Sequence, residues 1–148
     1  MKLFCALVLL AVSTATALPQ SIKILKVLPR YLDHKGRHTV SPSLYERDAY
    51  QAWLRKNPDA RSGLRFDVQW KARGLKEVKL RVELQGAAGK QPTKTVVQKA
   101  VMFRVGLSHW SDLAITGDDY KQFGELIAWR VTAWDGDKLV AEQKSFLW

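Results

Sequence analysis

Hydrophobic and polar residues alternate along residues 64–71, and this pattern predicts a β-strand with one buried face. The apolar set is Leu64, Phe66, Val68 and Trp70, and the polar residues between them are Arg65, Asp67, Gln69 and Lys71. Residues 78–84 repeat the pattern with Val78, Leu80, Val82 and Leu84. Because successive side chains of a strand lie on opposite faces, each segment is expected to bury its apolar set in a core.

The segment Leu126–Trp148 predicts a β-hairpin. Two β-rich runs flank Asp135-Gly136-Asp137, and an Asp-Gly pair favours a tight turn because glycine adopts positive φ at no steric cost. We expect a three-residue loop, which places Arg130 opposite Glu142. Further strands are expected at Ser21–Leu28, Thr93–Phe103 and Ser108–Thr116, the first at a sheet edge because Pro29 lacks a backbone donor.

One amphipathic helix is predicted near the N-terminus, at about residues 43–56. Ser43 and Glu46 have the spacing of a capping box, and Asn57-Pro58 ends the helix because a residue before proline avoids the α region. The apolar stripe expected to pack inward is Tyr45, Ala49, Ala52 and Trp53, and the opposite, solvated side is Arg47, Asp48, Gln51 and Arg55.

These elements predict a mainly β fold, an immunoglobulin-like antiparallel β-sandwich of about seven strands with one inserted helix. Arg130–Asp135 with its glycine turn resembles the F strand and F–G turn of fibronectin type III domains. Phe66–Trp70 resembles their B strand and Val78–Leu84 their C strand. The resemblance covers Leu64–Trp148 and implies a binding, spacing or anchoring role. The corner tyrosine of that family falls near Ile127 here, and the inserted helix is foreign to it.

The first residues have the form of a secretory signal peptide. Lys2 precedes an apolar run, Leu3–Val12, and Ala15-Thr16-Ala17 suits signal peptidase. Cleavage near Ala17–Leu18 divides the chain into a leader, 1–17, and a single domain, 18–148, secreted or periplasmic and without a transmembrane segment. An uncleaved membrane anchor is the alternative. The only cysteine, Cys5, lies in the leader, so the mature chain would have no thiol for a disulfide, a metal or a nucleophile.

The chain carries a formal charge of +10, which becomes +9 once Lys2 is removed with the leader. Such a charge can favour anionic polymers or lipid surfaces. No block of consecutive Lys or Arg is present, so we read the charge as a solvated basic surface and expect no specific nucleic-acid binding.

A polar insert, Arg30–His38, supplies candidate binding residues. His34 and His38, with Asp33, could form an acid–base or metal-binding set, but Gly36 between the histidines indicates a turn and no third ligand has a recognisable spacing. We therefore expect no metal and no cofactor. Arg37 of the insert and Arg47 of the helix could bind an anion.

Two further groups of polar residues have weaker chemical meaning. Ser108, His109, Ser111 and Asp112 include the residue types of a hydrolase triad, but a triad requires convergence of separate segments. Asp118, Asp119, Asp135 and Asp137 are oxygen donors that lack the spacing of a calcium loop and are explained by turns and a helix start.

Six tryptophans lie beyond the leader, and exposed ones could stack on sugars or on a partner. Trp70 and Trp129 fall at inward positions and are expected in the core, whereas Trp134 and Trp148 are expected to be exposed. The candidate binding residues are His34, Arg37, His38, Arg47, Trp134 and Trp148, with no catalytic residue among them.

The sequence therefore favours an exported, non-enzymatic sandwich that binds or supports an envelope or extracellular component, with a protein or polysaccharide as the partner. A carbohydrate-binding module using exposed aromatics is the first alternative. A small hydrolase built on His34 and His38 is the second.

Overall fold

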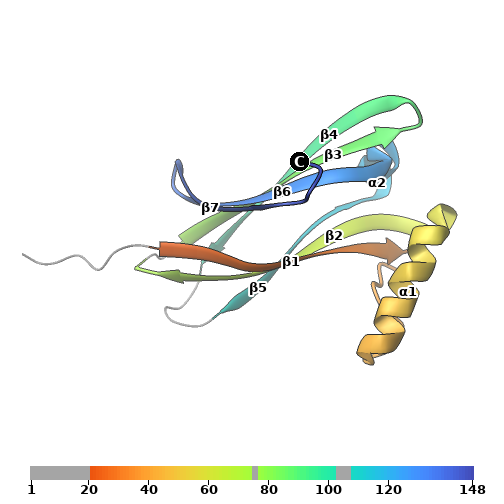
Figure 1. Ribbon diagram of the computed structural model, residues 1–148, viewed down its shortest axis with the longest axis horizontal. Helices are drawn as coiled ribbons and strands as arrows, with labels where there is room; N and C mark the ends of the chain where they lie inside the picture. Colours follow the sequence, from red (N-terminus) through yellow and green to blue (C-terminus); the bar gives the residue numbers. More distant parts are fainter. Residues whose placement is uncertain (1–20, 75–76, 103–107) are drawn as a thin grey trace, which may run out of the picture.

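The computed structural model describes residues 21–74, 77–102 and 108–148. Within these residues seven strands form two antiparallel sheets, one of three strands in the order β1-β2-β5 and one of four in the order β4-β3-β6-β7. The sheets face each other in a sandwich-like arrangement (Figure 1). The strands are β1 Ser21–Asp33, β2 Arg61–Arg73, β3 Glu77–Ala88, β4 Gln91–Met102, β5 His109–Thr116, β6 Glu125–Asp135 and β7 Lys138–Lys144.

The core lies between the two sheets and is built from the alternating residues of β2 and β3. Their predicted apolar sets are all buried, and the residues between them point outward. Phe66 of β2 contacts Trp129 of β6 edge to face, with ring centroids 6.0 Å apart, so this pair joins the two sheets across the core. The two strand faces and the buried position of Trp70 are as the sequence predicts, and Trp129 is partly buried and packs against this core.

Strand β1 is longer than the sequence predicts. It pairs only with β2, at the edge of its sheet, but it continues through Pro29 to Asp33 rather than ending at Leu28. Leu25 is bulged out where the register shifts. Because Pro29 lies on an edge strand, its missing N–H interrupts no ladder between two neighbours. As a result, Arg30 and Asp33 of the predicted insert belong to the sheet.

The β6–β7 hairpin corrects the predicted register. Asp135 pairs with Lys138, so the loop has two residues, and Gly136 has positive φ (56°) at the first of them, where a type II′ turn needs it. A register shift next to Trp134 then places Lys144, not Glu142, opposite Arg130. The predicted charge pair survives diagonally, with Arg130 Nη1 3.6 Å from Glu142 Oε2.

Helix α1, Leu44–Lys56, begins after Ser43, whose hydroxyl accepts a hydrogen bond from the amide of Glu46. A 3₁₀ turn, Pro58–Ala60, follows it, and a second helix, α2 Gly117–Phe123, connects β5 to β6. Helix α1 lies at one end of the sheets (Figure 1).

The predicted inward face of α1 is wrong. The buried residues are Gln51 and Leu54, whereas the predicted stripe of Tyr45, Ala49, Ala52 and Trp53 is exposed. The side-chain amide of Gln51 accepts from the N–H of Tyr31 and donates to its carbonyl, both at 2.9 Å, and so satisfies the edge-facing backbone groups of this one residue of β1.

The predicted leader, residues 1–17, lies outside the described residues. Across the part of the chain that is described, no helix has the length and apolar character needed to cross a membrane.

Candidate functional site

The carboxylate of Asp33, at the end of β1, organises the predicted insert. It accepts hydrogen bonds from the backbone amides of Lys35 and Arg37, from Arg37 Nε and from the hydroxyl of Tyr50. Burial alone would raise the pKa of Asp33, but these donors hold it well below its usual range. Arg37, a candidate anion ligand, is therefore already paired with a carboxylate of its own loop.

The two insert histidines are held by groups other than carboxylates. His34 Nε2 lies 2.7 Å from the carbonyl oxygen of Asp59, and His38 Nδ1 lies 3.0 Å from Nη2 of Arg65. Because a guanidinium can only donate, Nδ1 accepts and His38 is neutral here. Burial and the positive charges of Arg65 and Arg30 hold the pKa of His38 below its usual value. Neither contact pairs an imidazole with a carboxylate as a hydrolase relay would.

His38 lies beside a cluster of charged residues on the outer face of the three-stranded sheet. Arg30 of β1 and Arg65 of β2 lie opposite each other, and both bind Asp67, through Arg30 Nε at 2.9 Å and Arg65 Nε at 2.8 Å. Arg47 of α1 adds a further positive charge close to His38, although it is ion-paired with Asp48. Asp67 thus fixes two guanidinium groups on a flat strand surface.

Beside this cluster is a hollow of about 300 Å³, here called the Arg65 groove, which is lined by Arg65, Asp67, Trp110, Ser111 and Asp112. Strand pairing explains the convergence, because Asp112 of β5 lies opposite Asp67 and Trp110 lies opposite Gln69. The Trp110 side chain is 54% exposed. The groove combines an open aromatic surface with a fixed guanidinium and two carboxylates.

The sequence contains a signal for Trp110 that the strand prediction did not use. Ser111, Leu113 and Ile115 are the buried residues of β5, and Trp110 is out of phase with them. A period of two therefore places Trp110 on the outer face. Arg65 and Asp67 follow from the alternation of β2, but their meeting with Trp110 depends on the pairing of β2 with β5, which lies more than forty residues further along the chain.

Trp134 and Trp148 lie on the outer face of the other sheet and are each half-buried. The indole N–H of Trp134 donates to Thr132 at 2.9 Å, and the guanidinium of Arg130 lies 5.2 Å from the ring centroid of Trp148. Arg130 also binds Glu83 of β3 at 2.7 Å. These tryptophans thus cover the four-stranded sheet, and the structure does not bring them together with His34, Arg37, His38 and Arg47.

A partly buried polar network at the α1 end was missed by the sequence reasoning. Arg61 donates to the carbonyls of Leu54 and Arg55 at the end of α1, and its Nη1 binds Glu125 of β6 at 2.8 Å. The guanidinium also lies over the ring of Tyr31 at 4.0 Å. Burial and the Glu125 carboxylate raise the pKa of the Tyr31 hydroxyl to about 12. The polar groups of this network are paired with one another, and they connect α1 to both sheets.

The triad-like residues on β5 do not converge. Ser111 is buried and accepts a hydrogen bond from the indole of Trp70 at 3.0 Å, while Asp112 points to the outer face and binds Lys99 of β4. Alternation along the strand separates the two side chains. In residues 21–74, 77–102 and 108–148, no three His, Asp or Glu side chains are grouped so that they could hold a metal ion.

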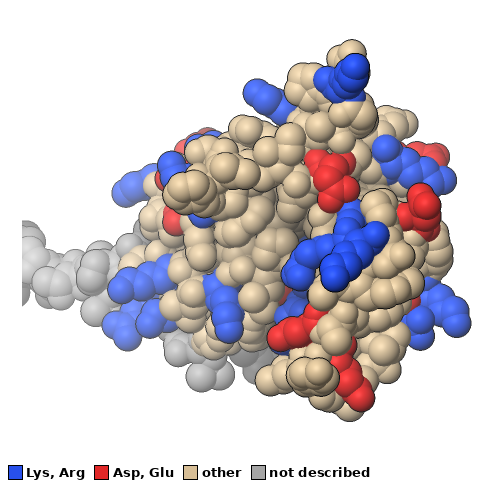
Figure 2. All heavy atoms as spheres, turned by 45° about the vertical axis from the view of Figure 1, so that its right-hand side comes forward, with Lys and Arg blue, Asp and Glu red and all other residues tan. Residues whose placement is uncertain are grey.

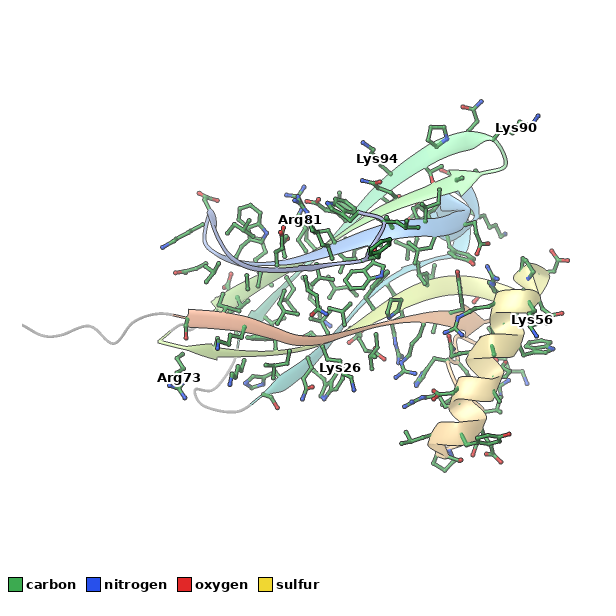
Figure 3. All side chains as sticks on the ribbon, viewed as in Figure 1. Lys26, Lys56, Arg73, Arg81, Lys90 and Lys94 are labelled. Carbon is green, nitrogen blue, oxygen red and sulfur yellow. The ribbon has the colours of Figure 1, made fainter. Side chains whose placement is uncertain are left out.

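Basic residues are distributed over the molecule. Figure 3 labels six cations that are spread over β1, α1, β2, β3, the β3–β4 turn and β4, namely Lys26, Lys56, Arg73, Arg81, Lys90 and Lys94. Lys23, Lys71 and Arg73 line a separate hollow of about 290 Å³ at the far end of β1 and β2. This arrangement fits a solvated basic surface better than a polyanion track.

No protein-family model and no curated protein matches this chain. Among solved structures, a crystal structure from Akkermansia muciniphila is similar, with 12% sequence identity and a TM-score of 0.54. The alignment covers 88% of this chain and 73% of that chain. At this identity the likeness supports a shared fold and carries no statement about activity.

Proposed function

We propose that the protein is an exported, non-enzymatic binding module that recognises an envelope or extracellular component through the Arg65 groove. The observation that carries this proposal is the exposed ring of Trp110 beside the Arg65–Asp67 ion pair. A large apolar ring kept in solvent costs hydrophobic stabilisation, and a few convergent polar groups beside it are what binding sites use to orient a ligand.

The order of the strands supports an immunoglobulin-like, fibronectin type III-like assignment for this module. With β1, β2 and β5 as strands A, B and E, these three share one sheet, and β3, β6 and β7 as C, F and G share the other. That division is the one immunoglobulin-like sandwiches use. Strand β4 takes the place of C′ beside C. Domains of this class hold partners on strand faces and loops, which agrees with a groove on an outer sheet face.

A saccharide is the ligand class that the groove favours. An indole face stacks on the C–H face of a sugar ring, and the guanidinium and carboxylates beside it match hydroxyl donors and acceptors. Asp112, exposed at the rim, and Arg65, fixed by Asp67, lie on the same side of the sheet as Trp110. This supports a polysaccharide of the envelope or extracellular matrix over an apolar ligand.

The test is an array of neutral and uronic-acid oligosaccharides probed with residues 18–148. Trp110→Ala is expected to weaken binding about tenfold, because loss of one aromatic contact is worth on the order of 1–2 kcal/mol. Trp53→Ala is the matched control, since Trp53 is a similarly exposed tryptophan on α1. Equal losses in both variants, or no binding anywhere on the array, would reject the groove as a saccharide site.

Export is tested independently of the ligand. We propose cleavage at Ala17–Leu18, on the basis of the apolar run and the Ala-x-Ala sequence. N-terminal sequencing of protein recovered outside the cytoplasm should begin near Leu18. Protein that carries Met1 in that fraction contradicts cleavage.

A further inference from the structure

The apolar stripe of α1 points away from both sheets. This outer face of α1 consists of Tyr45, Ala49, Ala52 and Trp53, which recur with helical spacing. Tyr45 is 83% exposed and Trp53 is 48% exposed. The sequence period of this helix is that of a packed face, yet its buried residues are Gln51 and Leu54 on the other side. The face with the amphipathic signal is thus the one the described chain leaves uncovered.

The helix is held in place before anything docks on it. Trp53 stacks on Tyr50 with ring centroids 5.7 Å apart, and Tyr50 is fixed by its hydrogen bond to Asp33. Arg61 binds the last carbonyls of the helix, with Nε 2.6 Å from the oxygen of Leu54. A rigid face loses little conformational entropy on association, so even a small contact area can be productive.

We propose that the outer face of α1 is a self-association surface, on which the same face of a second copy packs antiparallel. Ala49 and Ala52 occupy the middle of the face and permit a close approach of two helix backbones. Tyr45 lies toward one end and Trp53 toward the other, so a twofold axis near the alanines covers the aromatic rings of both copies. Such a self-complementary patch is what a twofold interface requires.

The charges of α1 favour this occupant and this orientation. Glu46 and Asp48 lie in the first half of the helix and Arg55 and Lys56 in its last turn. In an antiparallel pair the acidic half of one copy faces the basic half of the other, and the helix dipoles also oppose. Asp48, which pairs with Arg47 of its own chain, lies on the same side of the face as Arg55, so an antiparallel pair brings Asp48 and Arg55 of different copies together across the axis.

A lipid surface fits the face less well. Acidic residues border it, and Figure 2, in which the α1 end of the molecule comes forward, shows acidic and basic side chains interspersed there rather than one continuous basic field. Membrane-surface helices instead present a strongly basic polar side.

The geometry also sets the strength of the contact. A helix of 13 residues is about 20 Å long, so its contact is smaller than the roughly 800 Å² per partner of a standard stable interface. We therefore expect a rapidly reversible dimer with a dissociation constant on the order of 100 μM.

Sedimentation velocity of residues 18–148 across a concentration series that reaches on the order of 1 mM tests the proposal. The wild type should show a concentration-dependent rise in sedimentation coefficient, and Ala52→Glu should abolish it. Ala100→Glu, at an exposed position on β4, is the matched control and should leave it unchanged. Thermal melting of each variant verifies that the fold is retained.

A charge exchange tests the antiparallel orientation. Asp48→Arg and Arg55→Asp should each weaken association, since each places like charges across the axis, and the double variant should restore it. A monomer at every concentration overturns the proposal, as does association that Ala52→Glu does not affect. The proposal is also overturned if the monomeric chain floats with phosphatidylserine vesicles and Ala52→Glu abolishes this flotation. Saccharide binding at the Arg65 groove, measured by titration in solution, should be unaffected by Ala52→Glu, which separates the two sites.

Discussion

The hydroxyl of Tyr50 donates a 2.7 Å hydrogen bond to Oδ2 of Asp33. This contact joins the middle of α1 to the end of β1, and it places the aromatic pair of Tyr50 and Trp53 on a carboxylate that also holds the Arg37 loop. One acidic group therefore contributes both to the insert conformation and, together with Gln51 and Arg61, to the position of the helix. Its ionisation state should be visible in the stability of the whole domain.

The pH dependence of unfolding should report on Asp33. Because its pKa is lower in the folded than in the unfolded chain, the folded state binds fewer protons in this range. The stabilisation is therefore complete above a pH of about 4–5 and is lost as pH falls further. Asp33→Asn should lower the free energy of unfolding at pH 7 by roughly 2 kcal/mol. It should also reduce the further loss of this free energy as the pH falls into the acid range. Urea unfolding at a series of pH values measures both.

Asp112→Asn is the control for that series. The ion pair with Lys99 lowers the pKa of Asp112 as well, but both side chains are largely exposed. Solvent and salt screen such a pair, so its loss should be small and should disappear at about 1 M salt. If the free energy of unfolding of Asp33→Asn depends on pH in the same way as that of the wild type, the Asp33 carboxylate is not the group whose titration sets the acid dependence.

Trp70 and Trp110 should behave oppositely when replaced by alanine. Trp70 is fully buried, so Trp70→Ala removes a large core side chain and should cost about 3–5 kcal/mol. Trp110 is on the surface, and Trp110→Ala should change stability by less than about 0.5 kcal/mol. Chemical denaturation of the two variants measures this difference, and a cost for Trp70→Ala below about 1 kcal/mol would contradict the core assignment.

Gly124, between α2 and β6, should not tolerate a side chain. Its φ is +78°, and a Cβ would lie 2.2 Å from the carbonyl oxygen of Ala87. Gly124→Ala should therefore destabilise by more than about 2 kcal/mol, through both backbone strain and a clash. Gly89→Ala is the control, because Gly89 also has positive φ (+63°) but open space around it, and it should cost only about 1 kcal/mol. Thermal unfolding of both variants is the measurement.

How far the sequence predicts this molecule depends on the range of each interaction. The faces of β2 and β3 were predicted because a period of two depends only on neighbouring residues. The face of α1 was not, because Gln51 is buried by pairing with the backbone of Tyr31, which polarity alone does not indicate. The predicted hairpin register failed at two places: the loop has two residues rather than three, and a bulge beside Trp134 shifts every later pair by one more residue.

The candidate site is less predictable than the fold for the same reason. Trp110 could have been placed on the outer face from its phase on β5, but its neighbours Arg65 and Asp67 come from β2. The predicted candidates Trp134 and Trp148 lie on the other sheet and contact Thr132 and Arg130. Only strand order, a long-range property, brings the groove residues together.

We propose the Arg65 groove as the ligand-binding site of this protein. Nuclear magnetic resonance tests it directly, because each of the six tryptophans contributes one indole N–H signal. Residues 18–148 would be titrated with each oligosaccharide that binds on the array. We expect the Trp110 indole signal and the backbone amide signals of Arg65 and Asp112 to shift together, while the indole signals of Trp53, Trp134 and Trp148 stay in place. Shifts confined to those three tryptophans, with Trp110 unchanged, would contradict it.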